Sequence, residues 1–363
     1  MIQILDAATG KELRRFLPGP GSNFLAFDPT DKSLVTTWYD GSIHFWDPAT
    51  GKQLRSIERG QDRPASFAFS GDGKILATCP QPYQNKSTIH VLDAATGKEL
   101  AGIEPAHTQQ VSAALGGDGK VLVSWGTMRF TRADEQKEQV KLAQTAQVWD
   151  AATGKETRRI LTERGPVSGA AIAPDGKTLA LVTGFSTVQL WDLKGGQRLR
   201  SFQGRGGTYN SSLHYSPDGK LLALAYADGA VQVWEVGTGK RLPTHRGGRG
   251  RFCSLAFAPG GKVLACGLEG QTLIVWEVTT GKVYTPRAGH GSGVASVAFA
   301  ADGKELASVD TEGHIIRWDA GTGKELRRLD EFIPQNDNRR LIRDSLFTFS
   351  PNARYLASGR SNN

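Results

Sequence analysis

Apolar and polar positions alternate in short stretches along the whole chain, and turn-forming residues separate the stretches. The clearest copy starts at Val294, where VASVAF and ELASV alternate small or polar residues with apolar ones on either side of the turn ADGK. HIIRW and ELRRL then follow, each after another turn. Alternation with a period of two is typical of half-buried β-strands, so this copy predicts four strands, named a to d in chain order. No segment has a sustained helical period, and the sequence therefore predicts an all-β protein.

This four-strand pattern repeats, and an acidic residue preceded by tryptophan or leucine marks the end of strand c in each copy. Eight such pairs occur, beginning at Leu5, Trp46, Leu92, Trp149, Trp191, Trp234, Trp276 and Trp318. Most successive pairs are 41 to 43 residues apart, and two steps are longer, at 46 and 57 residues. Such a period is typical of the four-stranded blades of a propeller, which bury their faces by stacking on one another.

The chain begins and ends inside one repeat. Residues 2–16 match strands c and d, and residues 345–359 match strands a and b. We expect these half-repeats to pair into one blade, closing an eight-bladed β-propeller of four-stranded antiparallel blades. A seven-bladed ring over residues 23–329 is one alternative, but it would leave Ile4, Leu5, Phe347 and Phe349 in water. A fragment of a longer repeat array is the other.

Because the repeat runs from end to end, the sequence predicts a single domain over residues 1–363. The predicted blades span residues 23–57, 65–103, 111–160, 168–202, 210–242, 252–285, 294–329, and finally 345–363 together with 1–16. We expect the Trp residues of strand c to lie between adjacent sheets. Strand d, with its Lys and Arg residues, should be the outer edge, where its charges discourage pairing with other chains.

Several of these motifs resemble the WD-repeat β-propeller family along the entire chain. They are the Trp-Asp or Trp-Glu pairs, the turn YSPDGK at residues 215–220 and the strand LAS at residues 306–308. The regular TGKELRR and SPDGK repeats resemble bacterial members of that family. The resemblance implies an interaction scaffold with a role in signalling or assembly.

The same resemblance implies a structural role for one set of side chains. In the family, a hydrogen-bonded network joins a His before strand a, a Ser or Thr on strand b, an Asp six residues before the Trp, and the Trp. The matching positions here are His290, Ser308 and Trp318, with Glu312 where the family has Asp. Other blades match only in part, so we expect packing of Trp46, Trp149, Trp191, Trp234 and Trp276 to hold most of the fold.

Three longer connections interrupt the regular repeat, at residues 80–87, 126–144 and 330–344. In the WD-repeat family, the b to c turns and the d to a connections share one end of the blades, the top, which usually carries binding. Loops on a rigid scaffold also carry function more often than core positions do. The candidate partner-binding residues in these connections are Tyr83, Met128, Arg129, Phe130 and Arg132.

A second group of candidates consists of arginines in glycine-rich d to a connections. They are Arg205, Arg246, Arg249, Arg251 and Arg287. Guanidinium groups bind carboxylates and phosphates in a fork geometry, so clustered Arg on glycine-rich backbone suits an acidic partner. These residues predict that the top binds a protein or peptide of acidic character.

The overall charge changes this prediction little. The chain carries 44 Lys and Arg against 36 Asp and Glu, and its pI is near 9.4, values that also fit a nucleic-acid or other polyanion binder. However, many lysines, such as Lys177, Lys220 and Lys304, recur in turns at the opposite end of the blades, and no run of aromatics suggests base stacking. We therefore do not expect nucleic acid as the partner.

Three cysteines, Cys79, Cys253 and Cys266, are too few for a disulfide framework, and we expect free thiols. The chain has no apolar run long enough to span a membrane and no signal-like start, so we expect a cytoplasmic monomer.

No catalytic or metal-binding motif stands out in the sequence. We therefore expect a non-catalytic scaffold without a cofactor. The alternatives are a propeller enzyme with a cofactor or metal in a central funnel, a polyanion binder, and a stacking module that binds nothing.

Overall fold

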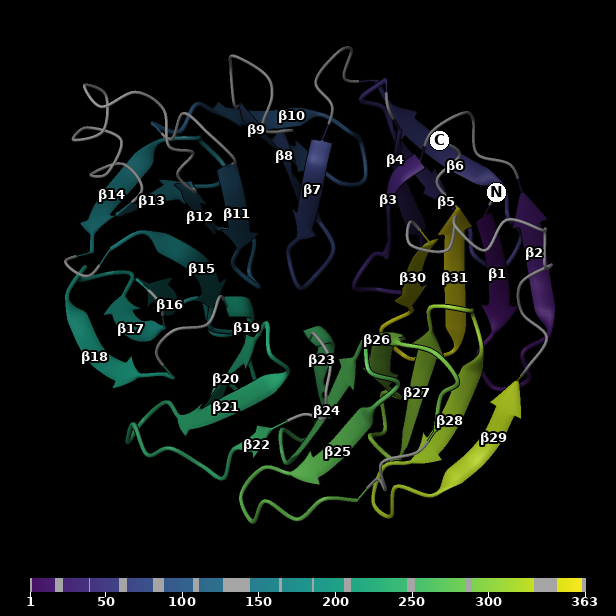
Figure 1. The fold of residues 1–363 in the computed structure, drawn as a ribbon. Coiled ribbons are helices and arrows are strands. Elements are labelled where there is room, and N and C mark those ends of the chain that lie inside the picture. The colour runs from purple at the N-terminus through teal and green to yellow at the C-terminus, as the bar shows by residue number, and fades with distance from the viewer. Residues whose placement is uncertain are drawn as a thin grey trace, which may run out of the picture. The chain divides into compact units, whose positions relative to one another are not determined.

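In the computed structural model, turns rich in Gly and Asp divide the described part of the chain into 31 short strands. The structure describes residues 2–16, 22–38, 40–58, 64–80, 88–106, 111–126, 144–162, 165–184, 186–205, 210–246, 252–284, 289–329 and 345–360. Within these ranges there is no helix, and the strands form eight antiparallel sheets, seven of four strands and one of three. The fold is an eight-bladed β-propeller, as the sequence predicts (Figure 1).

The chain forms two compact units, and the first comprises residues 1–58, 216–235 and 240–363. Blade 8 consists of β30 (Ser345–Phe349), β31 (Tyr355–Arg360), β1 (Ile2–Asp6) and β2 (Glu12–Phe16), and blade 1 of β3 (Ser22–Phe27), β4 (Leu34–Trp38), β5 (Ile43–Trp46) and β6 (Gln53–Ile57). Blade 6 consists of β23 (Phe252–Phe257), β24 (Val263–Leu268) and β25 (Leu273–Glu277), and blade 7 of β26 (Val294–Phe299), β27 (Glu305–Asp310), β28 (Ile315–Asp319) and β29 (Glu325–Leu329). From blade 5 this unit holds β20 (Leu221–Tyr226), β21 (Ala230–Glu235) and β22 (His245–Arg246).

The second unit comprises residues 59–215 and 236–239. Blade 2 consists of β7 (Pro64–Phe69), β8 (Ile75–Pro80), β9 (Ile89–Asp93) and β10 (Glu99–Ile103), and blade 3 of β11 (Val111–Leu115), β12 (Val121–Gly126), β13 (Thr145–Asp150) and β14 (Glu156–Leu161). Blade 4 consists of β15 (Val167–Ile172), β16 (Thr178–Thr183), β17 (Thr187–Asp192) and β18 (Arg198–Gln203). Strand β19 (Asn210–Tyr215) also belongs to this unit.

The two chain ends meet within blade 8, where β1 and β31 lie side by side (Figure 1). Strand β1 pairs antiparallel with β31, with Ile4 opposite Ala357, and the sheet order is β2, β1, β31, β30. Ile4, Leu5 and Phe349 are buried, with 0%, 1% and 8% of their surface exposed. The pairing of the terminal half-repeats is confirmed, and the seven-bladed alternative is wrong; the side chain of Phe347 lies outside the described residues.

The hydrophobic core lies between neighbouring blades. In the first unit, Val309 and Ile315 of blade 7 pack in one cluster with Leu5 and Leu356 of blade 8. In the second unit, blades 3 and 4 share a cluster in the same way. Trp46, Trp149, Trp234, Trp276 and Trp318 are buried, and Trp191 is partly buried. The tryptophans therefore act as packing residues, as expected.

The c to d turn of blade 3 shows how an aspartate and a glycine shape such a turn. In blade 3 the Asp150 carboxylate accepts hydrogen bonds from the Thr153 backbone N–H at 2.8 Å and its hydroxyl at 2.7 Å. Gly154 follows with φ of +67°, and a Cβ there would lie only 3.0 Å from the Cβ of Ala101 on strand d of blade 2. Glycine is therefore needed both for the left-handed backbone and for the close approach of the preceding blade.

Two arginines of strand d connect neighbouring blades in the second unit. Arg158 of β14 donates to the backbone carbonyl of Lys194 at 3.0 Å, in the c to d turn of blade 4. Arg200 of β18 donates to the carbonyls of Gly237 and Thr238 at 2.7 and 2.8 Å. The sequence predicted that these arginines lie on an outer edge, but it did not predict that they connect neighbouring blades.

Cys79 and Cys266 are buried and reduced, and the side chain of Cys253 lies outside the described residues. In the part of the chain that the structure covers, no helix has the length and apolar character needed to cross a membrane.

Candidate functional site

Most of the predicted partner-binding residues belong to connections that the structure does not describe. Tyr83, Met128, Arg129, Phe130, Arg132, Arg249, Arg251 and Arg287 all lie outside the described residues. Their role in binding stays a prediction.

Arg205 and Arg246 are the two predicted arginines with a described backbone. The carbonyl of Arg205 accepts a hydrogen bond from the Ser186 hydroxyl at 2.5 Å, which ties the end of blade 4 to its own b to c turn. Arg246 ends strand β22 and pairs with Ala230 of β21. Since β23 begins at Phe252, the arginine-bearing connection starts and ends on strands of the first unit.

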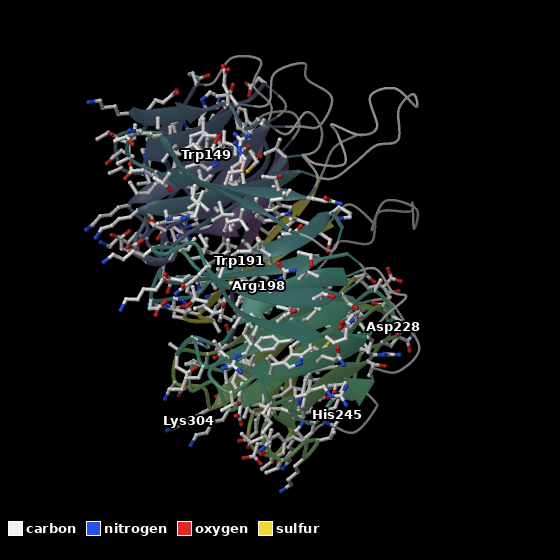
Figure 2. The ribbon with its side chains drawn as sticks, turned by 90° about the vertical axis from the view of Figure 1, so that its left-hand side faces the viewer. Trp149, Trp191, Arg198, Asp228, His245 and Lys304 are labelled. Carbon is white, nitrogen blue, oxygen red and sulfur yellow. The ribbon has the colours of Figure 1, made fainter. Side chains whose placement is uncertain are left out.

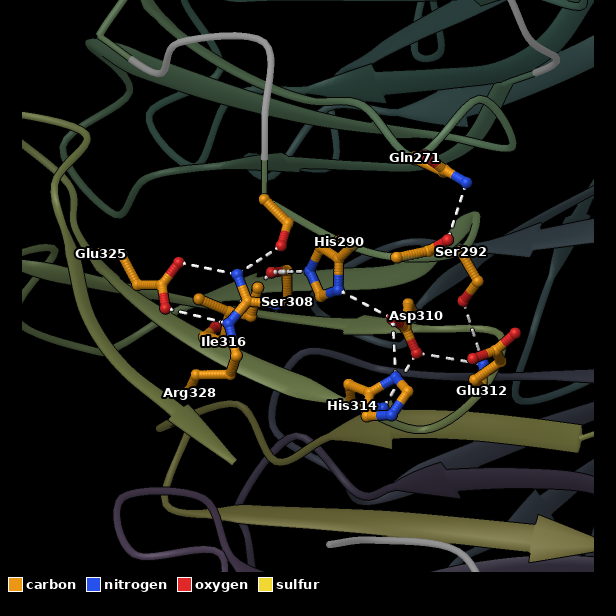
Figure 3. A network of polar contacts seen from close by, with 12 residues as sticks. Gln271, His290, Ser292, Ser308, Asp310, Glu312, His314, Ile316, Glu325 and Arg328 are labelled. Atoms are coloured by element: carbon orange, nitrogen blue, oxygen red, sulfur yellow. Dashed lines mark hydrogen bonds and ion pairs between the residues drawn. The ribbon is translucent and has the colours of Figure 1, made fainter. Parts of the chain in front are cut away.

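Blade 7 contains the polar network that the motif spacing indicated (Figure 3). The Trp318 indole N–H donates to the Ser308 hydroxyl oxygen at 2.8 Å, and His290 Nε2 lies 2.7 Å from the same oxygen. His290 Nδ1 is 3.2 Å from Asp310 Oδ2. Because a carboxylate only accepts, the Nδ1–H of His290 donates to Asp310, and Nε2 makes the second contact of the ring, with the Ser308 hydroxyl. All polar atoms of this ring are thereby satisfied.

The acid in this network is Asp310 and not Glu312, the position that the spacing indicated. The Asp310 side chain is fully buried, whereas Glu312 is exposed. Asp310 Oδ1 accepts the backbone N–H groups of Glu312 at 3.0 Å and His314 at 2.9 Å, and Oδ2 lies 3.1 Å from His314 Nδ1. The carboxylate therefore enters from the end of strand b, two residues before the turn position that the family pattern uses.

Asp310 and His314 were missed from the sequence. Their signal was an acid at the last position of strand b, directly before the turn that leads to His314.

Burial and hydrogen bonding act in opposite directions on the Asp310 carboxyl. Burial alone would raise its pKa, but the hydrogen bonds from His290 and from the His314 backbone, together with the charges of these histidines, lower the pKa to about 2. The carboxylate is thus held in its ionised form as the acceptor at the centre of the network.

The network also fixes the d to a connection that leads into blade 7. The Thr311 N–H donates to the Gly293 carbonyl at 2.8 Å, and the Gln271 side-chain amide of blade 6 donates to the Gly291 carbonyl at 2.7 Å. Arg328 of β29 donates to the Gly289 carbonyl at 2.5 Å. Residues 289–293 are therefore held from three sides, and the exposed Gly291, Gln271 and Glu312 sit on a rigid support.

Carboxylates recur on the described b to c turns of the first unit. Asp40, Asp228, Glu269 and Glu312 are all exposed, one on each turn of blades 1, 5, 6 and 7. In the sequence, Arg249 and Arg251 fall between Asp228 and Glu269, and Arg287 falls between Glu269 and Glu312. Along the chain, exposed acidic turns therefore alternate with arginine-bearing segments.

Other blades use parts of the same network. The indole N–H of Trp46 donates to the Thr36 hydroxyl at 3.0 Å, and that of Trp149 donates to the Ser124 hydroxyl at 2.9 Å. No comparable bond to a strand b hydroxyl is found for Trp191, whose N–H lies 3.2 Å from the Gln189 side-chain oxygen.

A second polar pairing, between strands c and d, was missed from the sequence. The Gln3 amide donates to Glu12 at 3.0 Å, and the Gln147 amide donates to Glu156 at 2.7 Å. His90 and Glu99 make the same contact at 3.3 Å. Each acid follows its partner by nine residues, a constant spacing that could have revealed the pairing.

These groups are suited to fixing backbone geometry. Ser308, Asp310 and the His290 side chain are buried away from solvent, so no substrate reaches them without local opening. Within the described ranges, no three His, Cys, Asp or Glu side chains are placed to hold a metal ion. The part of this site that a partner could contact is the exposed, preorganised backbone around Gly291.

Comparisons with known proteins agree with the fold. The sequence profile of a family described as outer membrane protein assembly factor BamB matches residues 65–329. A stretch of 67 residues is 37% identical to Cell division cycle 20.1, cofactor of APC complex, from Arabidopsis thaliana, and covers 18% of this chain and 15% of that protein. The crystal structure of the computationally designed Ika8 protein matches 94% of this chain and 96% of its own with a TM-score of 0.70 and 23% identity, which shows the fold alone.

Proposed function

Because the chain belongs to the β-propeller family described as outer membrane protein assembly factor BamB, we propose that it is a non-catalytic scaffold that binds a protein or peptide during complex assembly or signalling. The description of the matching family, an assembly factor, and the name of one similar protein, a cofactor of a complex, support a role in which the propeller joins other proteins. The Trp-Asp pairs and the network of Trp318, Ser308 and His290 support a propeller of the WD-repeat, bacterial type.

The observation that carries the proposal is the anchored connection at the top of blade 7. Residues 289–293 are tied to strand d (β29) and to the b to c turn of their own blade, and to Gln271 of blade 6. A surface that is ordered before binding loses less conformational entropy when a partner docks. Such a rigid end suits recognition by loops on a fixed scaffold, the role predicted for the insertions at residues 80–87, 126–144 and 330–344.

The arginines give the proposed partner its chemistry. Arg246, Arg249 and Arg251 occur within six residues that contain no acid, and Arg205 and Arg287 flank neighbouring blades. An acidic segment of a partner would form charge-assisted hydrogen bonds with these guanidinium groups. The protein is proposed to act as a monomer in the cytoplasm, and the acidic turns would orient basic groups of the same partner.

The experiment is capture of partners from the native lysate with wild-type protein and with Arg246, Arg249 and Arg251 changed together to Ala. We expect the triple variant to lose at least one partner that the wild type retains. The matched control changes Lys177, Lys220 and Lys304, in turns at the opposite end of the blades, and should retain every partner. Equal capture by all three proteins would contradict the proposal.

The same preparation separates the alternatives. A cofactor spectrum or a stoichiometric metal would favour a propeller enzyme. Recovery of nucleic acid with an affinity that falls steeply with salt would favour a polyanion binder.

A further inference from the structure

The outer strand of blade 5 has a histidine at a position that is apolar in six other blades. His245 of β22, labelled in Figure 2, lies opposite Val231 of β21. The residues at the same place in the register of the other outer strands are Phe16, Ile57, Ile103, Ile160, Phe202 and Leu329. Among these seven blades, blade 5 alone therefore has an ionisable side chain at this position.

This position packs against the next blade. In blade 8 the ring centroid of Phe16 lies 4.7 Å from that of Trp46 in blade 1. In blade 5 the ring centroid of His245 lies 5.1 Å from that of Trp276, which is fully buried in blade 6. A Cβ on Gly281, in the c to d turn of blade 6, would lie 3.7 Å from His245 Nε2. The imidazole therefore fills the contact between blades 5 and 6 as an apolar side chain does in other blades.

The surroundings of His245 favour its neutral form. Nε2 is buried and makes no hydrogen bond within the described residues. Burial lowers the pKa of His245 below its ordinary value of 6.5, and the backbone of Gly281 offsets part of this effect. The ionisable residues on the elements around it are Asp228 and Glu235 at the two ends of β21, Cys266 of β24, Glu277 of β25, Lys282 and Tyr284 in the segment that follows, and Lys240, Arg241 and Arg246 on its own segment. No charged group is among the causes of the pKa shift of His245, so burial is what opposes its protonation.

The backbone at His245 is held by a short strand. Strand β22 has two residues, whereas the outer strands of blades 7 and 8 have five each. Pro243 stands just before it and has no N–H to donate, while Leu242 donates to the Val233 carbonyl at 2.9 Å. The packing of His245 therefore contributes much of what holds β22 in place. Arg246, one of the arginines proposed to bind an acidic partner, is the other residue of this strand.

We infer that His245 makes the attachment of β22 to blade 6 sensitive to pH. Protonation would place a charge against Trp276, where other blades have an apolar group, and would release β22 together with Arg246. Because a released segment has the ordinary histidine pKa of 6.5, a fall in pH below this value favours the released form. The consequence for binding rests on the proposed function: a less ordered Arg246 loses more conformational entropy on docking, so an acidic partner would bind more weakly at mildly acidic pH.

Amide hydrogen exchange of the full chain tests the inference without any partner. After correction for the intrinsic rate, amides within residues 242–246 should exchange at least about threefold faster at pH 5.5 than at pH 7.5. His245→Phe, the residue type of blades 4 and 8, should remove this difference, and so should His245→Leu, the residue type of blade 7. The matched control is His44→Gln in blade 1, because burial also lowers the pKa of His44, and it should keep the difference.

Two results would overturn the inference. They are equal exchange of residues 242–246 at both pH values in the wild type, and a pH difference that persists in both His245 variants. Thermal melts check that the variants fold.

A fluorescent ten-residue peptide that alternates Glu and Gly then tests the link to binding. Its glutamates stay mostly ionised at both pH values. Its affinity for the wild type should fall about threefold between pH 7.5 and 5.5, and its affinity for His245→Phe should stay constant. An equal fall for both proteins would overturn the link between His245 and binding. A peptide that binds neither protein at pH 7.5 would count against the acidic partner of the proposed function, whereas hydrogen exchange alone decides whether His245 controls β22.

Discussion

Blades 6 and 7 are adjacent along the chain and share one strand register, yet they solve the same packing position differently. In each blade a leucine of strand b lies opposite the Trp of strand c. The residue two positions after this leucine determines whether the indole N–H has a hydrogen-bond acceptor. In blade 7 this residue is Ser308, whose hydroxyl accepts the Trp318 N–H. In blade 6 it is Cys266, and within the described residues the buried N–H of Trp276 has no acceptor.

The difference continues to the end of strand b. Blade 7 has the buried Asp310 there, whereas blade 6 has Leu268, which is fully buried and packs in one hydrophobic cluster with Trp276. Strands a, b and c pair in the same register in both blades, so the polar network is not required for that pairing. What it adds in blade 7 is attachment of residues 289–293 to the sheet. The comparison indicates that polar residues in this fold position the connections, while apolar packing holds the blades.

Removing residues 1–16 should destabilise the protein most. Blade 7 then loses apolar packing against a neighbouring blade, which is the interaction that the comparison identifies as holding the blades. The deletion removes the buried Ile2, Ile4, Leu5 and Ala7 and uncovers the blade 7 face around Val309. We expect a loss of at least about 5 kcal/mol of unfolding free energy, from the loss of three large apolar side chains and the exposure of their neighbours. Thermal unfolding followed by tryptophan fluorescence measures the loss.

The control for this deletion is the double substitution Ile2→Ala and Ile4→Ala, which keeps strand pairing and should cost less than the deletion. Unchanged thermal stability of the truncated protein would contradict the role of the N-terminal strands in blade 8.

The substitution Asp310→Leu gives blade 7 the residue type that blade 6 has at the end of strand b. It should have the next largest effect on stability. His290, His314 and two backbone N–H groups lose their acceptor while they remain buried or half-buried. We expect a loss of about 3 kcal/mol or more, because each buried unsatisfied group costs about 1–3 kcal/mol. Urea unfolding measures it.

The matched control is Glu312→Gln, at the exposed position that the spacing indicated as the acid. It should change stability by less than about 0.5 kcal/mol. A larger loss in Glu312→Gln than in Asp310→Leu would reverse the assignment of the carboxylate.

Lowering the pH should sharpen the comparison by protonating the buried carboxylate of blade 7. The pKa of Asp310 is lowered from 3.8 to about 2, so its ionised form stabilises the folded state above pH 3.8. This stabilisation, roughly 2 kcal/mol, should be lost as the pH falls from about 4 to 2. Urea unfolding at several pH values should therefore show a gap between wild type and Asp310→Asn that closes over this range. A gap that stays constant would refute the linkage.

The sequence predicted the blades well because the period, the turn residues and the apolar alternation all report the same local geometry. It also predicted that residues 2–16 and 345–359 form one blade, since pairing the two half-repeats buries the apolar face of each. The network at Trp318, Ser308 and His290 followed from the resemblance to a known family.

The acid of that network could not be predicted, because two acids, Asp310 and Glu312, stand two residues apart, and only the backbone conformation decides which one turns inward. The bonds from Arg158 and Arg200 to carbonyls of the next blade were also hidden, because backbone acceptors leave no trace in the sequence. The candidate site at the top of the blades remains a prediction, since most of its residues lie outside the described ranges.

The reverse exchange, Cys266→Ser, should move blade 6 toward blade 7 and stabilise the protein. A hydroxyl at this position would face the indole as Ser308 does and would accept the Trp276 N–H. We expect a gain of about 1 kcal/mol, the net value of a buried hydrogen bond. Cys79→Ser is the matched control. Cys79 of β8 lies opposite Ser66 of β7, and its neighbour Thr78 occupies the position equivalent to Cys266. Stabilisation by the control, or none by Cys266→Ser, would contradict the account.

The smallest expected effect concerns one position of the a to b turn, at which blades 6 and 7 have glycine and blade 8 has alanine. The a to b turns of blades 6 and 7 place Gly261 and Gly303 at φ of +69°, whereas blade 8 places Ala353 there at φ of 53°. The left-handed conformation costs a residue with a Cβ about 1–2 kcal/mol, and the greater flexibility of glycine in the unfolded chain offsets part of this. Ala353→Gly should therefore stabilise the protein by about 0.5 kcal/mol, and Gly303→Ala should destabilise it by about 1 kcal/mol. Chemical denaturation of both variants tests whether backbone conformation alone explains the glycine in this turn, and destabilisation by Ala353→Gly would show that packing of the Ala353 methyl group outweighs it.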